Sequence, residues 1–152
     1  MVNLSSYMRS DLVFLDIDAQ DKVDIFRKII DGMAERNVIN HPGAFLDEII
    51  QREEQAPTCI GRGIALPHTR TYFVEEPVIA FARTRKAVSF SDRALDAVEF
   101  VFLMGTPIND PDTYLHILGH LCALLRGRDF REALRGANSP EEIIAMFRSS
   151  EN

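Results

Sequence analysis

A single histidine, His68, ends a short stretch whose residue types could support nucleophilic chemistry. The stretch reads Gly61-Arg62-Gly63-Ile64-Ala65-Leu66-Pro67-His68. Gly61 and Gly63 permit close backbone approach and leave amide N–H groups free to meet an anion. Pro67 has a fixed φ and no amide hydrogen, which suits a strand end or a turn. An imidazole beside such amides could accept a phosphoryl group, or it could be an ordinary packed histidine at the end of a strand.

Two runs of sequence resemble a known family: Arg52-Glu53-Glu54, and Thr58-Cys59-Ile60 leading into the stretch that ends at His68. They are similar to the active-site block of the fructose/mannitol-class enzyme IIA domains of the bacterial phosphoenolpyruvate-dependent sugar phosphotransferase system. Within this family the chain most resembles the stand-alone nitrogen-related regulatory branch. The similarity covers nearly the whole chain, so we expect a single enzyme IIA-like domain over residues 1–152. The resemblance implies that a histidine phosphocarrier (HPr-like) protein phosphorylates His68.

The resemblance also suggests roles for side chains around His68. The family carries an arginine at the offset of Arg52, and a guanidinium can grip two phosphoryl oxygens at once. The alternative for Arg52 is a solvated residue near a helix end that pairs with a neighbouring glutamate. Thr58, Gly61 and Gly63 are lesser candidates for phosphoryl contacts, with simple turn chemistry as their alternative. We expect neither a metal nor a cofactor at this site.

One position departs from the family pattern. Many members place a second histidine beside the phosphorylated one, at the start of the helix after the last strand, and the matching residue here is Tyr114. Its hydroxyl could donate to a phosphoryl oxygen, but its ring could not carry positive charge. At 100° per residue, Tyr114 shares the inward-facing sector of a helix with three leucines, namely Leu118, Leu121 and Leu125.

Composition limits the class of protein. The chain has 152 residues, enough for one well-buried core, and its 46% hydrophobic and 26% charged residues are ordinary for a soluble globular domain. The net charge of -6 argues against general nucleic-acid binding. No stretch approaches the roughly 20 apolar residues of a membrane span, and residues 1–18 do not read as a signal peptide. We therefore expect a cytoplasmic protein without direct membrane insertion, with Cys59 and Cys122 as reduced thiols.

The spacing of apolar residues predicts a strand and two helices in the first part of the chain. Residues 12–17 read as the strand, and Asp18 is placed to cap the first helix. That helix has apolar residues at helical spacing, namely Val23, Phe26, Ile30 and Met33. Pro42 suits the first position of the second helix, which we expect to end near Arg52, just before the histidine block.

The second part of the chain is predicted to hold three strands and three helices. The strands cover 64–66, 78–84 and 98–104, and the last is so continuously apolar that we expect helices on both of its faces. The helices begin near Asp112, cover 130–134, and start at the capping box Ser139-Pro140-Glu141-Glu142. This order lacks regular βαβ alternation. It therefore predicts an α+β fold, a three-layer α/β/α sandwich with a mixed sheet.

These observations favour a phosphoryl carrier, a phosphotransferase that forms a transient phosphohistidine. Because the sequence shows no transporter segment or sugar-phosphorylating domain, we expect a regulatory, nitrogen-related output in which phosphorylation selects a target protein. Two alternatives remain open. The chain could be a separate IIA subunit that feeds a sugar permease domain. It could also be a protein-binding module that no longer transfers phosphate, with Tyr114 as the sign of that loss.

Overall fold

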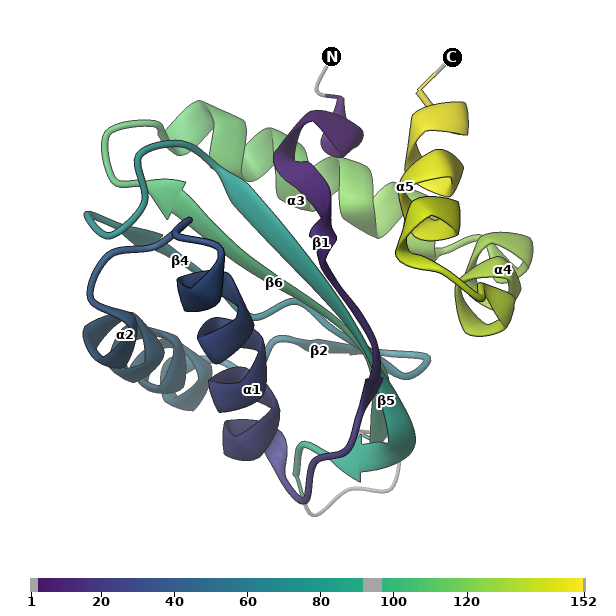
Figure 1. Ribbon diagram of the computed structural model, residues 1–152, viewed down its shortest axis with the longest axis horizontal. Helices are drawn as coiled ribbons and strands as arrows, with labels where there is room; N and C mark the ends of the chain where they lie inside the picture. Colours follow the sequence, from purple (N-terminus) through teal and green to yellow (C-terminus); the bar gives the residue numbers. More distant parts are fainter. Residues whose placement is uncertain (1–2, 92–96, 152) are drawn as a thin grey trace.

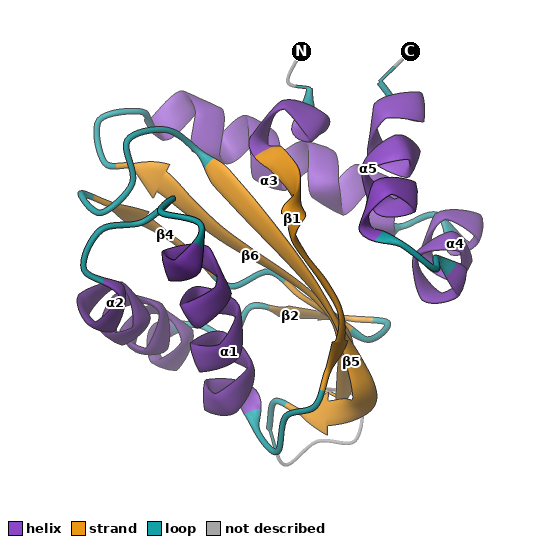
Figure 2. Cartoon of the chain, in the orientation of Figure 1, coloured by secondary structure: helices purple, strands orange, loops and turns teal. Residues whose placement is uncertain are grey.

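Helices cover both faces of a mixed β-sheet, because its central strands are apolar on both sides. The computed structural model describes residues 3–91 and 97–151. The helices α1 and α2 pack on one face and α3, α4 and α5 on the other (Figure 1, Figure 2). In chain order the elements are a short 3₁₀ helix Leu4–Tyr7, β1 Met8–Ile17, α1 Lys22–Glu35, α2 Pro42–Gln55, β2 Cys59–Gly61, β3 Ile64–Ala65, β4 His68–Thr71, β5 Val78–Ser89, β6 Ala97–Pro107, α3 Pro111–Leu125, α4 Arg128–Gly136 and α5 Pro140–Ser149.

The sheet places two short strands end to end along one edge of β6. Its strand order is β1-β5-β6-β3-β2, and β4 also pairs with β6. Strands β3 and β4 both run parallel to β6, with Ile64 opposite Phe100 and His68 opposite Met104. Strand β5 is antiparallel to β6 on its other side, and β1 is parallel to β5. The sheet is therefore mixed, and the predicted α/β/α sandwich is confirmed.

The central strands β5 and β6 feed two separate hydrophobic cores. Side chains alternate between the faces of a strand, so neighbouring residues enter different cores. In β6, Phe102 and Met104 pack toward α3, α4 and α5, whereas Val101 and Leu103 pack toward α1 and α2. All four are at most 1% exposed. This confirms the expectation that the continuously apolar strand is covered on both faces.

In the described residues after α2, 56–91 and 97–151, the structure has five strands, where the sequence predicted three. The additional strands are β2 and β4, which contain three and four residues. Segments this short do not reveal a period-2 pattern, so sequence periodicity cannot identify them. β4 is the strand that begins with His68. Strand β1 also starts at Met8 rather than at residue 12.

The helix ends agree closely with their sequence signals, with one correction. Asp21 caps α1, accepting a hydrogen bond from the Asp24 amide at 2.8 Å, so the prediction of Asp18 as the cap was wrong. Ser139 caps α5 as predicted and accepts from the Glu142 amide at 3.2 Å. The helix α3 begins one residue before the predicted start, and α4 extends two residues beyond each predicted end. Within the described part of the chain, no helix has the length and apolar character needed to cross a bilayer.

Replacing Phe102 by alanine should lower the free energy of unfolding by about 3–5 kcal/mol, because the ring is fully buried. Its centroid lies 4.8 Å from that of Phe81 and 5.9 Å from that of Phe147, so it joins the sheet to α5. Urea denaturation measures the change. Tyr72→Ala is the control, since that ring is 79% exposed and should change stability by less than about 0.5 kcal/mol. Equal effects at the two positions would contradict the described core.

Candidate functional site

A break in the strand along β6 positions His68. β3 ends at Ala65 and β4 begins at His68, with Leu66 and Pro67 between them. The Leu66 amide turns away from β6 and donates to the Thr58 carbonyl at 3.0 Å. Pro67 has no amide hydrogen to lose from the ladder, and its carbonyl accepts from the Met104 amide at 2.9 Å. The backbone therefore stays anchored to β6 on both sides of the break.

The hydrogen bonds of the imidazole define which nitrogen can react. Nδ1 of His68 lies 2.6 Å from the Leu66 carbonyl oxygen. Because a carbonyl oxygen only accepts, Nδ1 must carry the proton and donate it. Nε2 then bears the free lone pair, and it lies 3.4 Å from Nη2 of Arg52. This tautomer gives the ring a nucleophilic nitrogen that faces a guanidinium.

The surroundings also keep the imidazole of His68 neutral. Burial lowers its pKa, the hydrogen bond to the Leu66 carbonyl raises it, and the charge of Arg52 lowers it again. The net result is a pKa below the usual value of about 6.5. The residue is 8% exposed, so the ring is largely shielded but still reaches a cavity. A neutral, partly accessible imidazole is the form that can attack an electrophile.

Arg52 and Glu53 divide two roles between them at the end of α2. Arg52 donates to the Ala56 carbonyl at 3.3 Å with Nη1 and faces His68 with Nη2. No ion pair holds it to a neighbouring glutamate among the described residues. Glu53 is 3% exposed and instead accepts from the Thr58 amide at 3.1 Å and hydroxyl at 2.6 Å. This clamp, which the sequence did not reveal, fixes the chain that follows α2.

The structure does not bring Thr58, Gly61 or Gly63 to the cavity at His68. The Thr58 hydroxyl is committed to a buried carboxylate, as described above. Gly61 and Gly63 have φ angles of 84° and 80°, so they form the tight turn between β2 and β3, a left-handed conformation that favours glycine. Between them, Arg62 donates to the Arg126 carbonyl at 3.1 Å. Of the three residues predicted to contact the phosphoryl group, Thr58 therefore belongs to the clamp with Glu53, and Gly61 and Gly63 belong to the turn.

Tyr114 lies beside His68, as its helical sector predicts. The two ring centroids are 5.3 Å apart and the rings are tilted by 54°. Tyr114 lies in the first turn of α3, which Asp110 caps. Of the three leucines in that sector, Leu121 and Leu125 are buried and Leu118 packs against the same core.

A cavity of about 300 Å³ joins these residues. It also reveals Arg70, a basic residue that the sequence analysis did not single out. Arg70 lies two residues after His68 on β4, and residues i and i+2 of a strand share a face. This relation becomes visible only once β4 is recognised as a strand. Among the described residues the lining includes no acidic side chain and consists of Arg52, His68, Thr69, Arg70, Ile108 and Tyr114.

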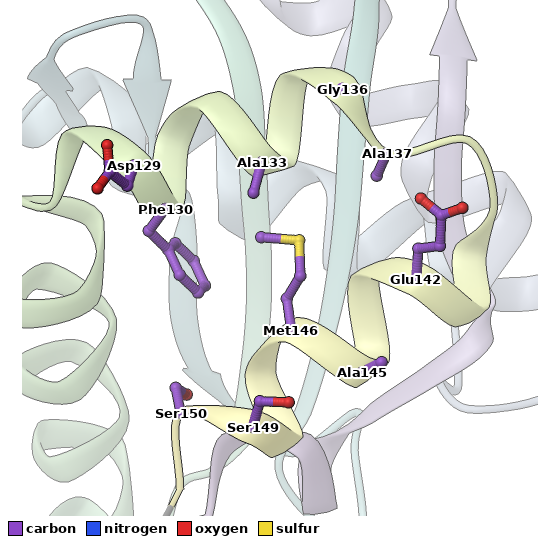
Figure 3. A pocket seen from close by; sticks show the side chains of 10 residues that line it. All are labelled: Asp129, Phe130, Ala133, Gly136, Ala137, Glu142, Ala145, Met146, Ser149 and Ser150. Atoms are coloured by element: carbon purple, nitrogen blue, oxygen red, sulfur yellow. The ribbon is translucent and has the colours of Figure 1, made fainter.

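A larger cavity of about 860 Å³ lies between α4 and α5 (Figure 3). Phe130 and Met146 point into it from the two helices (Figure 3). Its charged lining residues are the carboxylates Asp129 and Glu142, and none of the described residues that line it is a histidine, a cysteine or a base. The negative charge of such a lining would repel an anion. The smaller cavity at His68 is therefore the better candidate for phosphoryl chemistry.

Comparison with known proteins places this chain in a family. The profile of the family described as "Phosphoenolpyruvate-dependent sugar phosphotransferase system, EIIA 2" matches residues 6–150. The PTS system fructose-specific EIIA component of Haloferax volcanii is 27% identical over 143 residues, covering 94% of this chain and 93% of that protein. The fructose-specific EIIABC component of Bacillus subtilis is 27% identical over 146 residues, covering 96% of this chain but 23% of that longer protein.

A solved structure supports the same assignment. Nitrogen Regulatory Protein IIA-Ntr from Neisseria meningitidis matches with a TM-score of 0.87 and 26% sequence identity, covering 95% of this chain and 98% of that chain. The resemblance that the residues from Arg52 to His68 indicated is thereby confirmed.

The tautomer and pKa of His68 can be measured by NMR titration of the imidazole nitrogens. Because the folded pKa is lowered, the midpoint of protonation should lie below the usual value of about 6.5, and the ring should be mostly neutral at pH 7. Near neutral pH the ¹⁵N signals should show a protonated Nδ1 and an unprotonated Nε2. The folded protein should become less stable as pH falls below the unfolded pKa, because the unfolded chain then binds the proton more readily than the folded protein does. A midpoint above 6.5, or the opposite tautomer, would contradict the described environment.

Proposed function

This chain belongs to the EIIA 2 family of the phosphoenolpyruvate-dependent sugar phosphotransferase system, and from this premise we propose that His68 accepts a phosphoryl group and passes it on. The hydrogen bond from Nδ1 to the Leu66 carbonyl carries the proposal, because it leaves the Nε2 lone pair facing Arg52. In this proposal Arg52 binds the transferred group.

The proposed transfer forms one bond as another breaks. The Nε2 lone pair of His68 attacks the phosphorus of a phosphohistidine on the donor, and the donor nitrogen keeps the electron pair of the broken P–N bond. His68 becomes an imidazolium-like ring that still donates from Nδ1 to the Leu66 carbonyl, which stabilises the new charge. The transition state spreads negative charge over three phosphoryl oxygens. Arg52 moves its hydrogen bond from Nε2 to those oxygens.

The proposed donor is a histidine phosphocarrier (HPr-like) protein that docks around the cavity. Three large apolar side chains support such a surface, since Ile108 is 39%, Leu115 is 60% and Tyr72 is 79% exposed. Ile108 lines the cavity itself, and its amide donates to the Thr71 carbonyl next to Tyr72. Leu115 follows Tyr114 on α3. Exposed apolar side chains that gather around a reactive group are typical of a protein-binding surface.

The proposed output is regulatory and cytoplasmic, with phosphorylation of His68 deciding which target protein binds. The likeness to the nitrogen regulatory IIA-Ntr supports it. A phosphoryl group adds roughly two negative charges at pH 7, enough to create or abolish an interface. A second candidate output is sugar transport, in which phosphate passes to a permease domain. The 27% sequence identity to the fructose-specific EIIA component of Haloferax volcanii, which covers 93% of that protein, favours sugar transport.

Transfer to His68 is tested by incubation with a phosphorylated carrier protein. The wild type should gain an acid-labile, base-stable label, and His68→Ala should gain none. Arg52→Ala should slow labelling about 100-fold, because it removes the guanidinium that binds the phosphoryl oxygens. Arg52→Lys should be labelled more slowly than the wild type but faster than Arg52→Ala. His116→Ala is the control, since that exposed residue does not line the cavity. An unlabelled wild type would instead establish a non-transferring binding module.

The two outputs are separated by what removes the label. Mixing the phosphorylated protein with a fructose-class IIB domain should leave His68 labelled if the output is regulatory. In that case phosphorylated and unphosphorylated forms should retain different proteins from a lysate of the source cell. Rapid discharge of the label to the IIB domain would contradict the regulatory proposal and support sugar transport.

A further inference from the structure

Tyr114 contacts both His68 and a second arginine. The guanidinium carbon of Arg70 lies over the Tyr114 ring, 6.0 Å from its centroid, and the His68 ring lies 5.3 Å from the same centroid. His68 and Arg70 share a face of β4, so both side chains project toward α3. Tyr114, on α3, thus contacts both of these side chains of β4.

The charges at this cavity are unbalanced. The chain has a net charge of -6, and many of its arginines form ion pairs, Arg9, Arg85 and Arg135 among them. Among the described residues, no such ion pair includes Arg52 or Arg70. Both line the cavity at His68, to which the described part of the chain contributes no acidic residue. Two cations without a carboxylate partner at one cavity favour an anionic ligand there.

We infer, on the premise that His68 is phosphorylated, that Arg70 is a second cation that binds the phosphoryl group and that Tyr114 positions Arg70. Arg52 reaches the group from the end of α2, and Arg70 reaches it along β4. The face of an aromatic ring attracts a guanidinium, so Tyr114 holds Arg70 without supplying charge itself. Many relatives carry a histidine at the position of Tyr114. In this chain Arg70 supplies the positive charge, and Tyr114 positions Arg70.

Phosphoramidate tests this role of Arg70 without a docking protein. It transfers a phosphoryl group to Nε2 of His68 and releases ammonia, because the new N–P bond replaces the P–N bond of the reagent. Arg70→Ala should slow labelling of His68 at least about 10-fold with both phosphoramidate and the phosphorylated carrier. Arg70→Lys should restore part of the rate. Arg62→Ala is the matched control and should stay within about twofold, since its guanidinium binds the Arg126 carbonyl instead.

The positioning role of Tyr114 is tested in the same assay. Tyr114→Phe keeps the ring face and should retain most of the rate. Tyr114→Leu removes it and should lower the rate toward that of Arg70→Ala. In the double variant Tyr114→Leu/Arg70→Ala, the rate should match Arg70→Ala alone, because the ring acts through the arginine. Additive losses would overturn the positioning role. Thermal melting of each variant identifies any loss of fold.

The outcomes separate this inference from the proposed function. A wild type that neither donor labels would overturn the proposed function. A labelled wild type with an equally fast Arg70→Ala would overturn the inference alone. Slowing of Arg70→Ala only with the carrier protein would also overturn it, because Arg70 would then bind the carrier rather than the phosphoryl group. Slowing with both donors supports it.

Discussion

The site depends on one short hydrogen bond, the 2.6 Å contact between Nδ1 of His68 and the Leu66 carbonyl. This bond exists because the chain leaves the β6 ladder between β3 and β4 and turns its own carbonyl toward the following imidazole. It sets the tautomer, orients the ring and leaves Nε2 as the reactive nitrogen. Because donor and acceptor are two residues apart, the constraint is local and rigid. Among the neighbouring side chains, Arg52 faces the nitrogen that this bond leaves unprotonated.

Three separate parts of the fold meet at the cavity beside His68. The sheet supplies His68 and Arg70, α2 supplies Arg52, and α3 supplies Tyr114. Packing holds the elements in place, because each carries buried apolar side chains on the face that meets its core. The clamp between Glu53 and the residue Thr58 fixes the chain that leaves α2. Positions on packed elements keep such side chains in place better than positions on loops.

Charge at the site runs against charge on the whole molecule. The chain carries a net charge of -6, yet the described residues that line the cavity at His68 include two arginines and no acid. Arg52, which would hold a phosphoryl group, also helps to keep the resting imidazole neutral, since its positive charge lowers the pKa of His68. The positive charge of Arg52 thus favours the neutral, nucleophilic imidazole of His68 and would also bind the transferred phosphoryl group. The larger apolar cavity between α4 and α5 shares none of these properties.

The sequence by itself determined what depends on neighbouring residues. The block from Arg52 to His68, the inward face of Tyr114 and the order of the long elements follow from local pattern, because capping and periodicity are local. The tertiary structure decided what depends on distant segments. Strand β4 forms only by pairing with β6, so the shared face of His68 and Arg70 was not visible beforehand. Likewise, the turn at Gly61 and Gly63 does not line the cavity, because the antiparallel pairing of β2 with β3 places it elsewhere.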